Sequence, residues 1–469
     1  MPYAASRSRL VEKENVDRKV SMIEKPQEWL DKDQRYIWHG MGGYNPDASP
    51  MVAMEADGSW VTHIDGNRYL DGMAGMWCVN VGYGREELAK AAYEQLKTMS
   101  YYPMSQSHLP AIELGEKLNE WLDGEYVIRH SNSGSEANET AFKIARQYHA
   151  LNGEPGRYKF VARYRNYHGN TLGALAATGQ AQRRYLYEPL APGFLHVAPP
   201  DRYRCAFCSD RPACNMECAR EVERVINWEL PDTVAGVIIE VIITGGGILV
   251  PPDGYVEEVA RICERTGALL IVDEVGCGFG RTGKRFGYHH HDVEPDIVTI
   301  GKGMTSGYLP LSATAVRREV FETFNGTEEY GRLRQVNTFS GNPAACALAV
   351  KNLEIMEDED LPGRSALLGE RLRQELAELE GHPNVGDIRG KGLLFGIELV
   401  EDKENKRPAG TEMMDRLISA CKERGLILRY NRDTTPGVNN VLVMAPPLSI
   451  TDEDLRFIVG TVKESFEQL

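Results

Sequence analysis

The spacing of apolar residues predicts alternating helices and buried strands over the middle of the chain. Between residues 85 and 122, apolar side chains recur every three or four positions, which predicts amphipathic helices over 85–99 and 111–122. Further along, short apolar runs alternate with helical stretches. They cover 158–164, 234–243, 267–275 and 296–300. Such runs are typical of parallel strands covered by helices on both faces, so we expect a mostly parallel, doubly wound α/β sheet.

Towards both ends of the chain the pattern is mixed. Residues 51–72 contain short alternating runs and Asp-Gly turn signals, which predict a small antiparallel sheet. Near the C-terminus, an amphipathic helix over 364–380 precedes a strand over 391–400. A closing helix then starts near Thr451 and Glu453. This end is therefore expected to form a smaller α+β domain.

We divide the chain accordingly into three segments. Residues 1–74 are expected to be an N-terminal arm and part of the small domain, 75–338 the large domain, and 339–469 the C-terminal small domain. The first forty residues are polar and then rich in glycine, so we expect them to form an irregular arm.

Composition and charge narrow the possible partners and the compartment. The 469 residues are 42% hydrophobic and 26% charged, as in ordinary globular proteins. A formal net charge of −15 disfavours nucleic acid and anionic membranes as partners. No apolar run is long enough to span a bilayer, and the N-terminus lacks the apolar core of a secretory signal. Nine cysteines, an odd number, fit a reducing compartment, so we expect a cytoplasmic protein.

Small residues lead directly from the apolar segment YVIRH into a predicted helix. Ser133, Gly134 and Ser135 occupy this position. A helix start offers free backbone N–H groups and the positive end of a dipole, both of which suit a phosphate. The alternative is an ordinary serine cap with a loop glycine, and this short motif taken alone favours that simpler interpretation.

An acid and a lysine end two other predicted strands. Asp273 and Val275 point to the same face after GALLIV, so the carboxylate can meet a cationic ring nitrogen while Val275 packs on the ring. Lys302 stands between two glycines after DIVTI, where desolvation would lower its pKa and expose a nucleophilic amine. The alternatives are a turn cap for Asp273 and a solvated surface position for Lys302. Because parallel strands end at one edge of the sheet, the three motifs together predict a pyridoxal phosphate site.

Five motifs then make a resemblance specific. The chain resembles the class III (ω-type) aminotransferases of the aspartate-aminotransferase fold, also called PLP fold type I, from about Trp38 to its end. The shared segments, in the family's order and spacing, are NSGSEANETAFKIAR, YHGNTLGALAATG, DEVGCGFGRTG, GKGMTSGYLPL and NTFSGNPAACA. The resemblance implies pyridoxal 5'-phosphate as cofactor, with Lys302 forming the Schiff base and serving as general base and acid.

The resemblance also implies the other cofactor-binding residues. They are Ser133, Gly134, Ser135, Tyr167, His168, Glu240, Asp273, Val275 and Thr338. In the family's pattern the small residues at 133–135 hold the phosphate, Tyr167 and Val275 cover the two ring faces, and Asp273 pairs with the ring nitrogen. Glu240 lies near the ring. Thr338 would reach the phosphate of a neighbouring subunit, which implies a homodimer or a dimer of dimers.

On the substrate side, the sequence most resembles taurine–pyruvate and ω-amino acid–pyruvate enzymes. Trp77 stands at the position of a pocket-lining aromatic residue, although a core tryptophan is an equal alternative, and Tyr167 is a second residue expected to contact the substrate. Arg429 stands where those enzymes have an arginine for the acceptor carboxylate, and Arg432 is its rival. Glu240-Val241 replaces a usual Glu-Pro, and Gly276 a larger residue, which predicts a looser pocket.

The reaction implied is a ping-pong transfer of an amino group from a terminal amine to pyruvate. The donor would be taurine, β-alanine, a diamine or an aryl-alkyl amine. The alternatives are a decarboxylating transaminase, an aminomutase or a non-catalytic cofactor-binding protein on the same scaffold.

A cysteine cluster stands apart from these motifs. Cys205, Cys208, Cys214 and Cys218 follow a C-x2-C-x5-C-x3-C spacing, which has some likeness to structural zinc sets. The spacing is tight and no domain-sized unit surrounds it. We therefore favour a reduced or structural loop and expect no metal.

Overall fold

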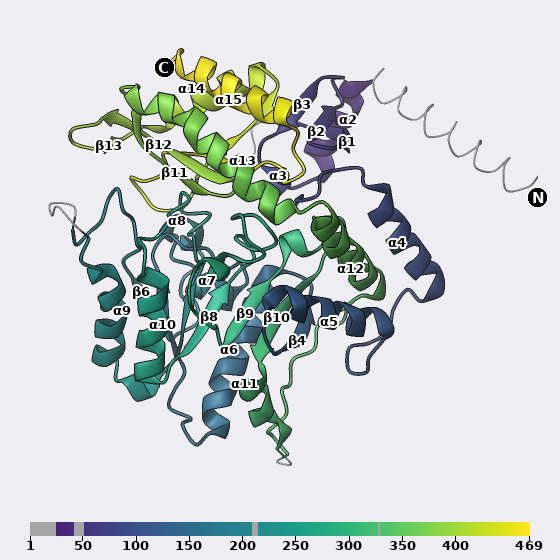
Figure 1. Ribbon diagram of the computed structural model, residues 1–469, viewed down its shortest axis with the longest axis vertical. Coiled ribbons are helices and arrows are strands. Elements are labelled where there is room, and N and C mark those ends of the chain that lie inside the picture. The colour runs from purple at the N-terminus through teal and green to yellow at the C-terminus, as the bar shows by residue number, and fades with distance from the viewer. Residues whose placement is uncertain (1–24, 42–50, 209–213, 327–328) are drawn as a thin grey trace, which may run out of the picture.

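The computed structural model describes residues 25–41, 51–208, 214–326 and 329–469. A large α/β unit carries the central part of the chain. A smaller layer above it contains the C-terminal helices together with the first strands (Figure 1). None of the described helices has both the length and the apolar character that a membrane span needs.

The central sheet has seven strands in the order β4-β10-β9-β8-β7-β5-β6, and only β10 runs against the others. Its strands are β4 (Tyr126–Ser131), β5 (Lys159–Arg163), β6 (Phe194–Val197), β7 (Val234–Ile239), β8 (Leu269–Asp273), β9 (Ile297–Ile300) and β10 (Ser312–Arg317). The four apolar runs predicted to be parallel strands are β5, β7, β8 and β9. This confirms the mostly parallel sheet.

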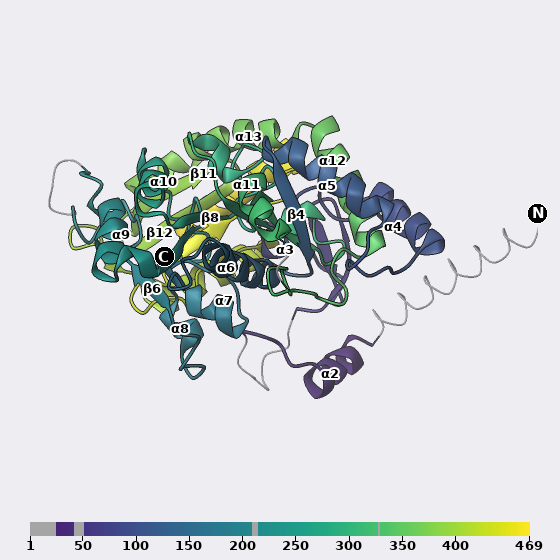
Figure 2. The same ribbon diagram turned by 90° about the horizontal axis from the view of Figure 1, so that it is seen from below.

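Helices cover both faces of this sheet, so alternate residues of its strands pack in two different cores. Ile238 and Ile271 pack with α6, whereas Val237 and Val272 pack in the core that contains α9 and α10. Figure 2 shows α6 and α10 on opposite sides of β8. The helices around the sheet are α4 (Glu86–Thr98), α5 (Leu109–Leu122), α6 (Gly134–Leu151), α7 (Leu172–Ala177), α8 (Ala181–Arg184), α9 (Glu217–Trp228), α10 (Tyr255–Thr266), α11 (Arg318–Glu322) and α12 (Pro343–Asp358).

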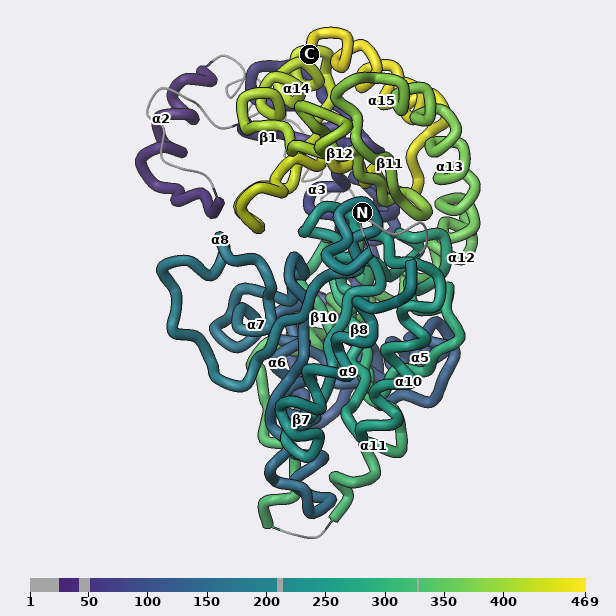
Figure 3. Tube along the Cα trace, turned by 90° about the vertical axis from the view of Figure 1, so that its left-hand side faces the viewer, coloured from purple at the N-terminus to yellow at the C-terminus, as the bar shows by residue number. Residues whose placement is uncertain are grey.

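Two smaller sheets form the upper layer, which Figure 3 shows stacked on the large unit. The first contains β11 (Val385–Lys391), β12 (Leu394–Asp402), β16 (Val441–Met444), β15 (Arg429–Tyr430) and β13 (Arg407–Pro408). The second contains β1 (Ala53–Asp57), β2 (Trp60–His63), β3 (Arg68–Asp71) and β14 (Leu426–Ile427). The antiparallel pairing predicted for 51–72 is present in β1–β3, and β14 joins β3 in parallel.

The longer helices that the structure describes in this layer are α13 (Leu361–Leu376), α14 (Thr411–Glu423) and α15 (Asp452–Phe466). Of these, α13 and α15 were predicted, and α14 was not. The side chain of Thr451 accepts a hydrogen bond of 3.0 Å from the Asp454 N–H, so Thr451 caps α15 as its position in the sequence suggested. Short helical turns complete the described part of the fold: α3 (Ala74–Trp77), η1 (Pro231–Thr233), η2 (Gly287–His290), η3 (Lys302–Met304), η4 (Thr323–Asn325) and η5 (Ala377–Gly381).

The prediction of an irregular arm over the first forty residues was wrong where the structure describes that region. Residues Pro26–Tyr36 form helix α2. Proline at the first turn fits a helix start, and Glu28 and Lys32 pair one turn apart at 2.7 Å. Residues 1–24 lie outside the described residues.

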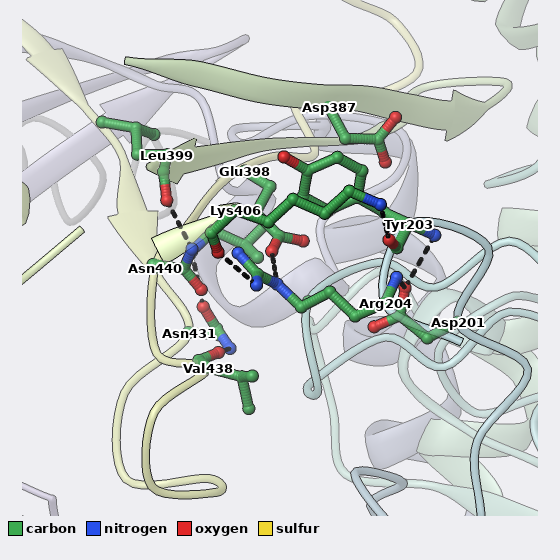
Figure 4. Close-up of polar contacts among 12 residues, drawn as sticks. Asp201, Tyr203, Arg204, Asp387, Glu398, Leu399, Lys406, Asn431, Val438 and Asn440 are labelled. Carbon is green, nitrogen blue, oxygen red and sulfur yellow. Dashed lines mark hydrogen bonds and ion pairs between the residues drawn. The ribbon is translucent and has the colours of Figure 1, made fainter. Parts of the chain in front are cut away.

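Buried charges join the upper layer to the large unit. Glu398 of β12 is fully buried and forms ion pairs with Arg204, from the loop after β6, and with Arg389 of β11 at 2.8 Å. Arg389 also donates to the Gly247 carbonyl oxygen at 2.8 Å, beyond β7. Figure 4 shows Arg204 between Glu398 and the Asp201 turn. The fixed network holds the two parts in one arrangement around the carboxyl ends of the parallel strands.

Candidate active site

Lys302 lies in η3, immediately after β9, and its side chain is half-buried. Its backbone adopts a φ of +42°, a conformation that costs energy for a residue with a side chain. Nζ is 5.0 Å from the centre of the Trp77 ring. Burial lowers the pKa of Lys302, although Asp273 and Glu240 act in the opposite direction. The position therefore favours a free amine and contradicts the solvated-surface interpretation.

Asp273 ends β8 with only 3% of its surface exposed. One carboxylate oxygen, Oδ2, accepts a hydrogen bond from Asn138 Nδ2 at 2.8 Å and lies 2.8 Å from Nδ1 of His168. The other oxygen, Oδ1, accepts from the Val275 N–H at 3.0 Å, so the predicted turn cap is also present. A buried carboxylate held in place by polar neighbours suits a partner with a cationic ring nitrogen.

Two further residues, which the sequence analysis did not identify, hold this cluster in place. Asn138 of α6 also donates to the His168 carbonyl oxygen at 2.7 Å, and its own side-chain oxygen accepts from Thr299 Oγ1 of β9 at 2.8 Å. A signal was present in the sequence. Asn138 stands on the apolar face of its helix, and Thr299 interrupts the apolar run DIVTI. Polar residues in such positions usually have a buried partner.

Glu240, next after β7, holds the backbone around the pocket. Its Oε1 accepts from the Tyr167 N–H at 3.0 Å, and its Oε2 accepts from Thr244 N and Oγ1 at 3.0 and 2.6 Å. The looser pocket predicted at Gly276 is not found, because a Cβ there would lie 2.9 Å from Thr244 Cγ2. Val241, in place of the expected proline, is buried in the core.

The small residues at the start of α6 lie against the strand end that carries Asp273. Ser133 caps the helix, as the simpler interpretation held, with its side chain accepting from the Glu136 N–H at 3.3 Å. A Cβ at Gly134 would lie 2.9 Å from Val275 Cγ1. Ser135 Oγ accepts from the Asn170 N–H at 3.1 Å. The helix start and the turn after β8 thus form adjoining walls, as their common sheet edge predicted.

The remaining sequence candidates lie in different surroundings. Trp77 is half-buried, and its Nε1 is buried without a hydrogen-bond partner among the described residues. Thr338 and Arg429 are exposed and make no hydrogen bond or ion pair with the groups above. Arg432 is partly engaged, with Asp415 at 3.8 Å and the Tyr430 ring centre at 5.1 Å.

Cys205, Cys208 and Cys214 precede α9, and Cys218 lies in its first turn. The sulfur atoms of Cys205 and Cys208 are 3.1 Å apart, and all nine cysteines are free. The contact with Cys205, together with burial, raises the pKa of Cys208 to about 11. Within the described ranges, no three or more His, Cys, Asp or Glu side chains are arranged to hold a metal ion.

The residues at this sheet edge fit pyridoxal phosphate. A buried carboxylate suits the ring nitrogen, and a half-buried lysine suits the aldehyde. The positive end of the α6 dipole suits the phosphate, and the buried Trp77 Nε1, which has no partner among the described residues, offers one more donor to a ligand. Fold and site together define a pyridoxal-phosphate-dependent transaminase of fold type I.

The chain belongs to the class III aminotransferases. The family model described as "Aminotransferase class-III" matches residues 43–466. The uncharacterized aminotransferase YhxA of Bacillus subtilis strain 168 is 62% identical over 95% of this chain and 98% of its own length. A taurine–pyruvate aminotransferase of Bilophila wadsworthia is 40% identical over 92% of this chain and 96% of its own.

Solved structures agree with this assignment. A Bacillus anthracis aminotransferase superimposes with a TM-score of 0.92 at 60% identity, covering 95% of this chain and 99% of that one. The ω-transaminase of Pseudomonas jessenii, in complex with PMP, has a TM-score of 0.88 at 33% identity and covers 94% and 97%. The predicted fold class and cofactor are therefore confirmed.

Proposed function

We propose that this aminotransferase moves an amino group from a terminal (ω) amine to pyruvate by a ping-pong mechanism. The observation that carries the chemistry is the half-buried Lys302, whose pKa is lowered beside the buried Asp273 cluster. The choice of substrates is supported by the similarity to taurine–pyruvate aminotransferases and ω-transaminases. Taurine, β-alanine, a diamine or an aryl-alkyl amine are the donors to test.

Each residue of the site has a proposed task. Bound pyridoxal phosphate supplies an aldehyde for amines and a ring that accepts electrons. The Lys302 amine acts first as a base, which removes the proton from the donor carbon that bears nitrogen. It then acts as an acid and gives a proton back later in the transfer. Asp273 keeps the ring nitrogen protonated, and His168 and Asn138 orient that carboxylate. Tyr167 and Val275 would cover the two ring faces and exclude water.

The proposed substrate contacts come from other elements. Trp77, 5.0 Å from Lys302 Nζ, would line the donor pocket. Arg429 would bind the acceptor carboxylate, for which a planar guanidinium with paired donors is well suited. Arg429 is exposed and its side chain has no hydrogen bond or ion pair with another described residue, whereas Arg432 is already partly engaged.

We also propose a homodimer or a dimer of dimers in the cytoplasm. Around the exposed Thr338, the apolar side chains of Val336 and Phe339 are 70% and 68% exposed, and Tyr101 packs edge-on against Phe339. Exposed apolar side chains gathered in this way favour a subunit contact, through which Thr338 would reach a neighbouring phosphate. Nine free cysteines favour a reducing compartment.

The test is the absorption spectrum of the purified holoenzyme during addition of amines and then pyruvate. We expect the band of the bound cofactor to bleach with a terminal amine and to return with pyruvate. Lys302→Ala should lower turnover by at least about 10³-fold, as expected when the group that transfers the proton is lost. Lys351→Ala, a surface lysine paired with Glu354, is the matched control and should behave as the parent.

The outcomes separate the alternatives. Release of carbon dioxide from the donor would indicate a decarboxylating transaminase, and conversion of a single substrate would indicate an aminomutase. If Lys302→Ala turns over as fast as the parent, the role of Lys302 is refuted. If no amine bleaches the band, the terminal-amine proposal is refuted.

A further inference from the structure

Arg183 lies beside Tyr167 of the proposed cofactor site and has no acidic partner in the part of the chain that the structure describes. It lies in α8 and is half-buried. The guanidinium carbon is 5.1 Å from the centre of the Tyr167 ring. Its Nε donates to Gln180 Oε1 at 2.6 Å, and one terminal nitrogen lies 3.3 Å from the Met41 sulfur. No carboxylate among the described residues lies within ion-pair distance of it.

The neighbouring arginines differ in this respect. Arg184 has Glu188 at 3.7 Å, and the buried Arg165 forms an ion pair with Asp201. Burial lowers the pKa of Arg183, opposed by Tyr167 and Asp433, but an arginine remains charged at any working pH. A partly desolvated charge without a partner is unfavourable unless an anion binds next to it.

The residue just before α8 lies next to the loop that follows Glu240. Gln180, which anchors Arg183, donates to the Arg165 carbonyl oxygen at 3.0 Å. A Cβ at Gly245 would lie 3.2 Å from Gln180 Nε2 and 3.6 Å from Tyr167 Cβ. Gln180 and Tyr167 therefore meet at the loop that follows Glu240.

The same short helix contacts the segment that follows Arg429. The Gln182 N–H donates to the Thr434 carbonyl oxygen at 3.0 Å, and Asn439 Nδ2 donates to Gln182 Oε1 at 2.6 Å. Figure 2 shows α8 at the edge of the molecule beside α7. The Arg183 side chain therefore lies over the ring of Tyr167, while its neighbour Gln182 contacts the upper layer.

We propose that Arg183 binds the terminal acid group of the donor, a carboxylate or a sulfonate, and so selects ω-amino acids over neutral amines. The inference rests on the proposed function and deepens it. A guanidinium offers two parallel donors, which match the oxygens of either acid. Stacking on Tyr167 and the bond to Gln180 hold the fork in place before the donor arrives. Arg429 would keep the acceptor carboxylate.

The test compares Arg183→Gln, Arg183→Lys and the parent as holoenzymes. Donors are β-alanine and taurine, which carry an acid, and 1-phenylethylamine, which does not. For Arg183→Gln we expect the KM of both acidic donors to rise about 10- to 100-fold, the usual effect of losing hydrogen bonds to a charged group. The KM for 1-phenylethylamine and for pyruvate should stay within about twofold. Arg183→Lys should be intermediate, because it keeps the charge but loses the fork.

Arg184→Gln is the matched control, since it removes an adjacent arginine of the same helix. It should leave all the KM values unchanged. An equal loss for every donor in Arg183→Gln would show that Arg183 only supports Tyr167, and a rise confined to the KM for pyruvate would place it in the acceptor site. Either result, or no change at all, overturns the inference.

A binding measurement separates this inference from the proposed function. Ethanesulfonate carries the acid group but no amine, so its binding to the holoenzyme, followed by isothermal titration calorimetry, needs no turnover. We expect Arg183→Gln to weaken its binding about 10-fold or more, whereas Arg184→Gln should not. If the parent consumes no terminal amine but binds ethanesulfonate more tightly than Arg183→Gln does, the proposed function fails and the acid site stands. Equal binding by the parent and Arg183→Gln overturns the acid site.

Discussion

At the scale of single residues, burial decides the chemistry of the site. Lysines and aspartates usually remain solvated, yet Lys302 is half-buried and Asp273 almost fully buried at neighbouring strand ends. Desolvation disfavours the charged amine of Lys302, whereas Asn138, His168 and the Val275 N–H surround the Asp273 carboxylate. Burial therefore lowers the pKa of the lysine, while hydrogen-bonding neighbours hold the buried carboxylate in place.

The lowered pKa of Lys302 has a testable consequence for cofactor binding. Because only the unprotonated amine attacks an aldehyde, capture of pyridoxal phosphate by the apoprotein should accelerate with rising pH as Lys302 loses its proton. We expect the midpoint below 10.5, the ordinary value for lysine. The rate at which the visible band appears measures it, and Nα-acetyl-lysine is the control for the cofactor's own titration. A midpoint at or above that of the control would contradict the burial argument.

At the scale of elements, one helix is fixed to two strands by polar contacts inside an apolar core. Asn138 connects α6 to Asp273 of β8 and to Thr299 of β9. The apolar contacts of α6 fix which face meets the sheet, but these directional bonds fix its position along the strands. The start of α6 therefore stays next to the turn after β8.

Replacing Asn138 by leucine should test this connection. The Thr299 hydroxyl and one Asp273 oxygen would each lose a buried partner, so we expect the free energy of unfolding to fall by about 1–3 kcal/mol. Denaturant titration of the apoprotein gives the change. Asn152→Ala, at the exposed end of the same helix, is the control and should cost less than about 1 kcal/mol. A leucine variant as stable as the parent would show that apolar packing alone positions α6.

At the scale of the whole molecule, buried charges dock the upper layer on the large unit (Figure 4). Glu398 pairs with two guanidinium groups, those of Arg204 and Arg389, and none of its surface is exposed. Removing one member of such a cluster leaves the others charged and desolvated. The upper layer therefore docks on the large unit in one specific arrangement, although apolar residues of similar volume would fill the same buried space equally well.

Glu398→Gln should destabilise the assembled molecule by about 3–5 kcal/mol, which thermal unfolding would show as a lower midpoint. Glu401→Gln is the matched control on the same strand, because Glu401 and its partner Arg407, at 2.8 Å, are largely exposed. Such a surface pair contributes about 0–1 kcal/mol. Equal midpoints for the two variants would contradict a docking role for the buried charges.

Local signals in the sequence were enough to predict the parallel strands and the groups at their ends. Apolar runs identify buried strands because burial on both faces removes the polar alternation. Parallel strands bring Ser133, Asp273 and Lys302 to one edge whatever lies between them. The helix over 26–36 was missed because its glycine-rich continuation suggested an irregular arm, while its proline and its charge pair favoured a helix.

The tertiary structure alone decided which distant side chains meet. Asn138 and Thr299 are far apart in the sequence, and their bond depends on the packing of α6 against β9. Whether Arg183 lacks an acidic partner depends equally on how α8 folds over Tyr167. Periodicity reports which face of an element is buried, but a hydrogen bond or an unpaired charge depends on a neighbour from elsewhere in the chain.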